Sequence, residues 1–189
     1  VYKRQEKDLV NLVHHYRNNP SVVMWCVGNE VPNQWDESGC KISKFLQDIC
    51  HREDPTRPVT QGMDAPDAVV NNNMAAVMDV AGFNYRPFRY QVNYQKLPQG
   101  IILGSETAST VSSRGVYKFP VERKAMAVYE DHQSSSYDVE HCNWSNLPED
   151  DFIQHEDLPY CIGEFVWTGF DYLGETTPVS YTHLTLPTN

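Results

Sequence analysis

The 189-residue sequence has no long hydrophobic run and no excess of positive charge. No apolar stretch approaches the roughly 20 residues that a membrane-spanning helix requires, so we expect no membrane partner. Lys and Arg number 15 against 25 Asp and Glu, which gives a formal net charge of −10. Because a nucleic-acid backbone and an anionic lipid surface both require local positive potential, we expect neither of them as a partner.

Several common active-site motifs are also missing. The five cysteines form no Cys-x-x-Cys pair, which argues against a zinc knuckle or a thioredoxin-like site and leaves the cellular compartment open. There is no Gly-rich phosphate loop, no Ser nucleophile elbow and no His-Glu-x-x-His metal motif. We therefore expect neither a metal nor an organic cofactor. The chain begins at Val1 without an initiator Met, and we expect it to be part of something longer.

The sequence does contain an alternation of helix-like and strand-like segments. Apolar residues at helical spacing predict helices around residues 9–16 and 42–49, and a further helix is expected at 147–157. Strands are predicted at 22–27, 59–62, 77–85, 101–105 and 161–167. Their continuous apolar runs are typical of strands buried in a parallel sheet. The alternation predicts an α/β fold, interrupted by a long polar segment between residues 107 and 160.

Polar and aromatic residues stand where the predicted strands end. They are Asn29, Glu30, Asp64, Asn84, Tyr85, Glu106 and Trp167. Parallel α/β sheets and barrels carry their reactive groups just past the carboxyl ends of the strands. Two carboxylates across a cleft with aromatic walls are the groups that glycoside hydrolysis needs, since one protonates the leaving oxygen and the other attacks or activates water. We expect Asp64 to be a capping or turn residue, and Trp144 to be either a sugar platform or a packing residue.

Three segments resemble glycoside hydrolase family 2. Residues 20–30 (PSVVMWCVGNE) resemble its acid/base strand, and residues 101–109 (IILGSETAS) resemble its nucleophile strand in a bacterial β-galactosidase branch. Residues 163–175 (GEFVWTGFDYLGE) resemble the last barrel strand of that branch. The resemblance implies a partial TIM (β/α)8 barrel, about strands 4 to 8, with a long irregular insertion before the last strand.

The resemblance also implies a role for five residues. Glu30 would be the general acid/base and Glu106 the nucleophile of a retaining exo-β-galactosidase that forms a covalent glycosyl-enzyme. Asn29 would hold the sugar 2-hydroxyl, Tyr85 would hydrogen-bond the nucleophile, and Trp167 would form a wall of the subsite for the non-reducing sugar. The implied partner is a β-galactoside or a related oligosaccharide. A β-glucuronidase, a β-mannosidase and a non-catalytic sugar-binding relic are the alternatives.

The resemblance covers only the later part of the family's catalytic domain. The first three barrel strands and the β-sandwich domains of the family have no counterpart here. We therefore expect residues 1–178 to be a partial catalytic barrel that is poorly stable and inactive alone, because two strand edges are left open. Residues 179–189 (VSYTHLTLPTN) also match nothing in the family, and we expect them to be an extraneous tail from sequence assembly.

Overall fold

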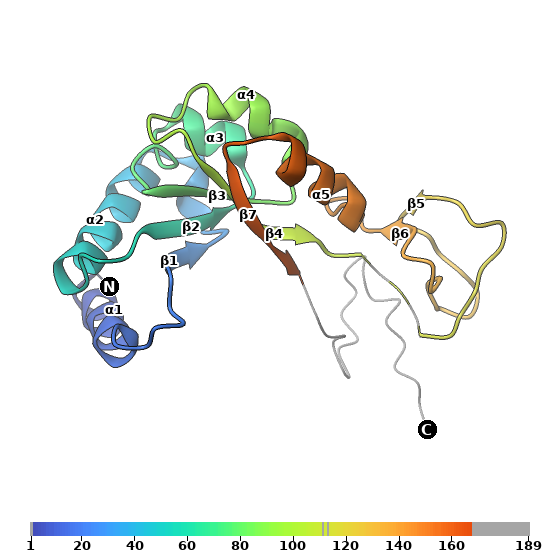
Figure 1. Cartoon of the computed structure of the whole chain (residues 1–189), viewed down its shortest axis with the longest axis horizontal. Helices are drawn as coiled ribbons and strands as arrows, with labels where there is room; N and C mark the ends of the chain where they lie inside the picture. The colour runs from blue at the N-terminus through green and yellow to red at the C-terminus, as the bar shows by residue number, and fades with distance from the viewer. Residues whose placement is uncertain (1, 111, 113, 168–189) are drawn as a thin grey trace.

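The computed structural model describes residues 2–110, 112 and 114–167 (Figure 1). Five parallel strands form one sheet in the order β1-β2-β3-β4-β7. They are β1 (Trp25–Asn29), β2 (Val59–Met63), β3 (Val80–Asn84), β4 (Ile102–Ala108) and β7 (Cys161–Trp167). The predicted α/β fold with a parallel sheet is confirmed. The proposed tail at 179–189 and the part of the third family motif after Trp167 lie outside the described residues.

Helices cover one face of this sheet. The helices α2 (Ser38–Glu53), α3 (Pro66–Asn71), α4 (Tyr90–Tyr94) and α5 (Pro148–Asp157) follow the strands, and α1 (Tyr2–Tyr16) precedes β1 and packs against α2 (Figure 1). The sequence predicts α1, α2 and α5 but neither α3 nor α4. These two helices span six and five residues, which is too short for helical periodicity to appear in a sequence.

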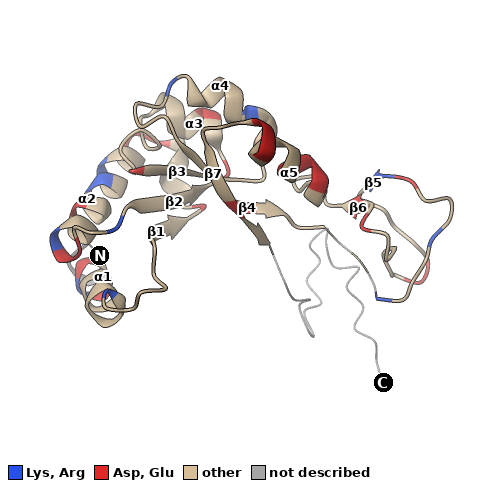
Figure 2. Cartoon of the chain, in the orientation of Figure 1, with Lys and Arg blue, Asp and Glu red and all other residues tan. Residues whose placement is uncertain are grey.

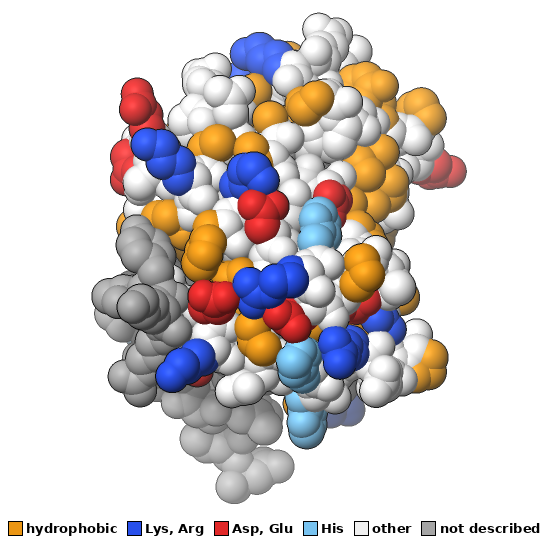
Figure 3. Space-filling model, turned by 90° about the vertical axis from the view of Figure 1, so that its left-hand side faces the viewer, with side chains coloured by type: hydrophobic (Ala, Val, Ile, Leu, Met, Phe, Trp, Pro, Cys, Tyr) orange, Lys and Arg blue, Asp and Glu red, His pale blue; other side chains and the backbone are white. Residues whose placement is uncertain are grey.

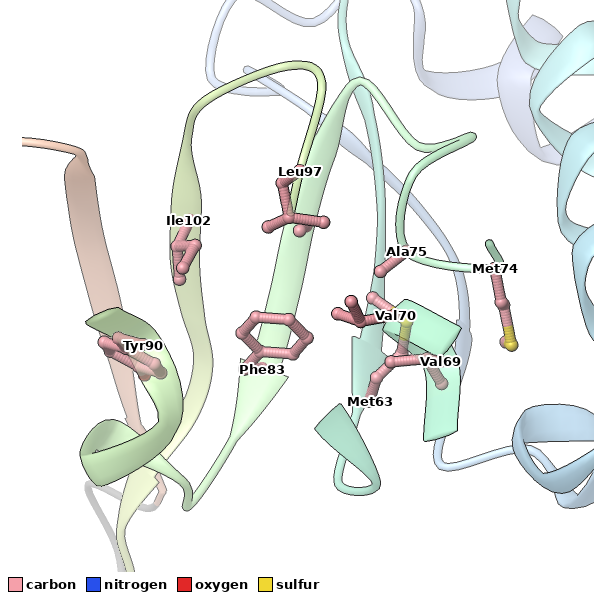
Figure 4. Close-up of a cluster of buried hydrophobic side chains, with 10 residues drawn as sticks. Met63, Val69, Val70, Met74, Ala75, Phe83, Tyr90, Leu97 and Ile102 are labelled. Atoms are coloured by element: carbon pink, nitrogen blue, oxygen red, sulfur yellow. The ribbon is translucent and has the colours of Figure 1, made fainter. Parts of the chain in front are cut away.

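The main hydrophobic core lies between the sheet and the short helices (Figure 4). Met63, Phe83 and Ile102 come from three neighbouring strands and are fully buried. Val69 of α3 and Tyr90 of α4 close the cluster, and the rings of Phe83 and Tyr90 stack with centroids 6.2 Å apart. A packed interior resists small displacements, so this core fixes the strands whose carboxyl ends carry polar residues.

The two edge strands of the sheet, β1 and β7, are more open than β2 and β3, whose residues are all buried. Within the described part of the chain, β1 pairs only with β2, and β7 pairs only with β4. Phe165 of β7 is 62% exposed, and Cys26 of β1 is exposed although the sequence predicts a strand buried on both faces. The burial prediction is wrong for Cys26 because an apolar run does not reveal whether a neighbouring strand is present.

A long irregular excursion joins β4 to α5, as the sequence predicts. It contains β5 (Lys124–Ala125) and β6 (Glu140–His141), which pair in parallel with each other and lie to one side of the main sheet (Figure 1). After β6 the chain returns to the carboxyl end of β4, where the Asn146 N–H donates to the Ala108 carbonyl at 3.0 Å. The excursion therefore ends next to the strand that carries Glu106.

The surface over α1 and α2 carries interspersed acidic, basic and histidine side chains (Figure 3). His14 contacts Glu53 at 2.6 Å and Lys44 contacts Asp48 at 2.8 Å. Exposed pairs of this kind contribute little to stability, typically about 0–1 kcal/mol each. Among the described helices, none combines the length and the apolar character needed to cross a membrane.

Candidate active site

The carboxyl ends of β1, β3 and β4 bring the expected site residues together. Asn29 ends β1 and Glu30 follows it, Tyr85 follows β3, and Glu106 lies within β4. Backbone bonds set the register between these ends. The Glu30 N–H donates to the Gly62 carbonyl at 2.9 Å, and the Tyr85 N–H donates to the Glu106 carbonyl at 2.9 Å.

Two of these positions have a strained backbone. Glu30 has a φ of 45° and Tyr85 has a φ of 54°, in the left-handed region that non-glycine residues rarely adopt. Such conformations persist where the surrounding structure holds them, and they cluster at functional sites. Gly62 of β2 is constrained by space and not by its backbone angle. A Cβ atom at this position would lie 2.2 Å from Oδ1 of Asn29. Only glycine therefore allows the β2 backbone to approach the site this closely.

A buried amide links the first carboxylate to the sheet. Asn84 is fully buried at the end of β3, and its Nδ2 donates to Oδ1 of Asn29 at 2.9 Å and to Oε1 of Glu30 at 2.8 Å. Its Oδ1 accepts a bond from the Ser105 hydroxyl at 2.6 Å. One amide thus orients both Asn29 and Glu30, and Ser105 in turn orients that amide.

The second carboxylate is held by a phenol. The Tyr85 hydroxyl donates to Oε2 of Glu106 at 2.7 Å, and the Tyr85 side chain is buried. The indole of Trp144 packs edge-on against the Tyr85 ring, with centroids 4.7 Å apart and planes at 72°. The hydrogen bond fixes one oxygen of Glu106, and the ring contact restricts the movement of Tyr85.

Burial and neighbouring charges act on the carboxyl of Glu30. The pKa of Glu30 is raised above its ordinary value, chiefly because protein atoms exclude water from its carboxyl, although the residue as a whole is exposed. The negative charges of Asp64 and Glu106 raise this pKa further, whereas the bond from Asn84 and the charge of Arg86 lower it. Glu30 therefore keeps its proton to higher pH than an ordinary glutamate does.

These groups share one cleft of about 380 Å³. It is lined by Asn29, Glu30, Asp64, Tyr85, Arg86, Glu106, Trp144 and Trp167. All five residues singled out by the family resemblance are on this list, including Trp167, which ends β7 and is 42% exposed. The cleft has carboxylates, a phenol and two indoles within reach of a single small ligand.

Sequence reasoning missed part of this cleft. Asp64 was expected to be a capping or turn residue, but it lines the cleft and its charge acts on Glu30. Arg86 also lines the cleft. Because it directly follows Tyr85 at the end of β3, its place in the sequence could have predicted this. Trp144, for which the sequence leaves a sugar platform and a packing role open, lines the cleft and packs against Tyr85. Elsewhere, no three His, Cys, Asp or Glu side chains of the described residues are arranged to hold a metal ion.

A parallel α/β sheet with polar residues grouped at the carboxyl ends of its strands is the arrangement of α/β-barrel enzymes, whose active sites lie at that end of the barrel. The family model "Glycosyl hydrolases family 2, TIM barrel domain" matches residues 3–182. The chain therefore belongs to glycoside hydrolase family 2, and its fold is a partial TIM barrel.

The relatives that this chain matches are much longer than the chain itself. The β-galactosidase BoGH2A of Bacteroides ovatus is 29% identical over 215 residues, covering 93% of this chain and 25% of that protein. A family 2 glycosyl hydrolase structure from Bacteroides cellulosilyticus is 28% identical with a TM-score of 0.61, covering 90% of this chain and 18% of that one. A β-D-glucuronidase of Dictyoglomus thermophilum shares the fold, with a TM-score of 0.65 at 17% identity, covering 88% of this chain and 28% of that one. The chain thus spans about a quarter of the length of BoGH2A.

Proposed function

We propose that this chain is the catalytic part of a retaining exo-β-galactosidase. One observation carries the proposal: a single cleft holds Glu106, bonded by the Tyr85 phenol, and Glu30, whose pKa is raised. Glycoside hydrolysis needs one carboxylate that is ionised and one carboxyl that can donate a proton. The chain spans only part of the length of its relatives, and we propose that a longer polypeptide, the complete enzyme, contains it. Residues 1–178 alone are expected to be inactive.

The proposed reaction has two steps. In the first, an oxygen of Glu106 forms a bond to the anomeric carbon while the bond to the aglycone oxygen breaks, and the Glu30 proton moves to that leaving oxygen. In the second, Glu30 accepts a proton from water, the water oxygen bonds to the anomeric carbon, and Glu106 is released. The two displacements together retain the configuration at that carbon.

The remaining cleft residues fit the recognition of a sugar. Oδ1 of Asn29 is occupied by Asn84, so its Nδ2 is the part of the amide that can donate to the 2-hydroxyl. Trp167 and Trp144 offer aromatic surfaces, which stack on the apolar faces of sugar rings. Tyr85 restrains the oxygen of Glu106 to which it is bonded, which leaves the other oxygen for attack on the anomeric carbon.

The charge of the cleft favours a neutral sugar over a uronide. Among the described lining residues, Glu30, Asp64 and Glu106 are carboxylates and Arg86 is the one guanidinium. Nη1 of Arg86 donates to the backbone carbonyls of Tyr85 and Trp144, both at 2.9 Å. A sugar carboxylate would therefore meet more negative than positive charge. This supports the galactoside assignment that the similarity to BoGH2A also favours.

The substrate class is tested with the complete enzyme on aryl β-galactosides, β-glucuronides and β-mannosides. The proposal expects kcat/KM to be highest for the galactoside and the released sugar to have the β configuration, as NMR of the first-formed product would show. Preference for a glucuronide or mannoside would move the assignment to that alternative, and an inverted product would exclude the retaining mechanism. The absence of hydrolysis on all three, with sugar binding intact, would favour a sugar-binding relic.

The Tyr85→Phe variant is expected to lower kcat by about 10²-fold, because Glu106 loses the hydrogen bond that holds it in position for attack. The phenyl ring keeps its packing against Trp144, so the variant is expected to fold normally. Tyr117→Phe is the matched control, because Tyr117 is exposed in the irregular segment. Steady-state kinetics on an aryl β-galactoside, with thermal unfolding alongside, measure both effects. A kcat equal to that of Tyr117→Phe would contradict the role of the phenol.

The Asp64→Asn variant is expected to move the alkaline limb of the kcat/KM profile to lower pH. The charge of Asp64 raises the pKa of Glu30, so removing that charge lets Glu30 lose its proton earlier as the pH rises. Asparagine keeps the oxygen that accepts a bond from Nε2 of Gln34 at 2.8 Å. The control is Asp67→Asn, an exposed acid paired with Arg89. An alkaline limb that stays in place, or moves upward, would show that Asp64 does not act on the proton donor.

A further inference from the structure

One carboxylate beside the cleft is buried and is not used in the proposed mechanism. Asp151 lies in the first turn of α5 beside two further acidic residues, Glu149 and Asp150 (Figure 2). It is fully buried, unlike its two neighbours, and burial raises its pKa to about 6. Its Oδ2 accepts a bond from the Ala108 backbone N–H at 2.9 Å. Burying a carboxyl costs free energy of folding. We therefore ask what Asp151 does at this place in the structure.

The partner of Asp151 is a strained residue just past the expected nucleophile. Ala108 ends β4 two residues after Glu106, and Ala108 and Ser109 have φ values of 59° and 62°. Consecutive left-handed residues with side chains persist only where other groups hold them. The Ala108 N–H is bonded to Asp151, and its carbonyl accepts a bond from the Asn146 N–H at 3.0 Å. Both backbone polar groups of Ala108 are therefore bonded to the segment 146–151.

The same segment reaches the phenol that holds Glu106. Nδ2 of Asn146 donates to the Tyr85 carbonyl at 3.3 Å. Two residues earlier, the Trp144 ring packs edge-on against Tyr85, and its carbonyl accepts a bond from Arg86. The stretch 144–151 thus contacts the strand end after Glu106 on one side and Tyr85 on the other.

We propose that Asp151 is a positioning residue for Glu106, an inference that rests on the nucleophilic role proposed above. By accepting the Ala108 amide, Asp151 holds the left-handed exit from β4 and so fixes the direction in which the Glu106 side chain leaves the strand. Glu106 then meets the Tyr85 hydroxyl in one orientation. Positioning requires the acceptor oxygen of Asp151 and not its negative charge.

Two variants of Asp151 in the complete enzyme separate the role of its acceptor oxygen from the role of its charge. Asp151→Asn keeps the shape and an acceptor oxygen but removes the charge. Asp151→Leu keeps the branching and fills the buried space, but it has no acceptor for the Ala108 amide. Asp150→Asn is the control, because Asp150 is the adjacent residue on the surface and pairs with Arg123 at 2.9 Å.

The measurement is titration of active sites with a 2-deoxy-2-fluoro-β-galactoside that carries a dinitrophenolate leaving group. The burst amplitude counts folded, competent sites, and the rate constant reports attack by Glu106 at each of those sites. For Asp151→Leu we expect the amplitude to stay close to one per chain and the rate constant to fall by about 10- to 100-fold, as slight misplacement of a reacting group does. For Asp151→Asn and Asp150→Asn, both values are expected to stay near those of the unmodified enzyme.

Two results would overturn the inference directly. One is an unchanged rate constant in Asp151→Leu, and the other is an equal loss in Asp151→Asn, which would assign the effect to charge. A low burst amplitude in Asp151→Leu would mean that few of its sites are folded, and the rate constant is then measured on Asp151→Ala instead. Failure of both to fold while Asp151→Asn folds would make the acceptor a folding requirement and would equally overturn positioning. The Glu106→Gln variant separates the two proposals, since normal labelling of that variant would remove the proposed function itself.

Discussion

Replacing Glu106 by Gln in the complete enzyme is expected to lower kcat on an aryl β-galactoside by about 10⁴-fold or more, the range found when a catalytic nucleophile is removed. An amide nitrogen and a neutral carbonyl oxygen cannot form the acylal bond to the anomeric carbon. Glutamine still fills the space of Glu106 and can still accept the Tyr85 hydroxyl, which donates at 2.7 Å in the unmodified protein. The loss is therefore expected without a comparable change in thermal stability.

Mass spectrometry gives the sharper measurement for this variant. Incubation with the 2-fluoro-galactoside should add one glycosyl group to the unmodified enzyme, and digestion should locate it on Glu106. Glu106→Gln should remain unlabelled, whereas Glu122→Gln, which changes an exposed acid of the irregular segment, should label normally. A label on any other carboxylate, or activity of Glu106→Gln near that of Glu122→Gln, would refute the assignment of the nucleophile.

Much of the site could be predicted because parallel strands place their carboxyl ends at one edge. Asn29 and Glu30 stand at the end of one apolar run, and Glu106 stands at the end of another, so the sheet brings them together whatever the details of the helices. The family resemblance rested on the same strands. Expected strand boundaries were off by a few residues. β1 begins at Trp25 rather than residue 22, and β4 runs on to Ala108.

The groups that orient the carboxylates were harder to predict, because they act through contacts between distant segments. Asn84 was visible as a strand-end amide, but its bond to Glu30 joins residues 54 positions apart. Asp151 acts on Ala108 across 43 positions, from a segment without a long periodic pattern. A one-dimensional pattern indicates which residues end a strand, and it contains no information on which backbone amide a remote carboxylate meets. The left-handed conformation of Ala108 gave no signal either, since alanine does not favour it.

The Glu30→Ala variant is expected to show an effect that depends on the leaving group. For an alkyl or sugar aglycone, which needs a proton to depart, kcat/KM should fall by about 10²- to 10⁴-fold, the usual contribution of a positioned acid. For a dinitrophenyl galactoside, which departs as a stable anion, the first step should be nearly unchanged and hydrolysis of the glycosyl-enzyme should limit turnover. Glu37→Ala, an exposed acid close in sequence, is the control.

Azide and pH separate the two roles of Glu30. Azide needs no general base, so it should restore turnover of the dinitrophenyl substrate and yield β-galactosyl azide. In the unmodified enzyme the raised pKa of Glu30 keeps its proton to higher pH than an ordinary carboxyl, and kcat/KM for an alkyl or sugar aglycone should fall as the pH rises through that pKa. Glu30→Ala should lose this alkaline limb. A limb that persists in Glu30→Ala, or azide that accelerates the unmodified enzyme as strongly, would show that another residue delivers the proton.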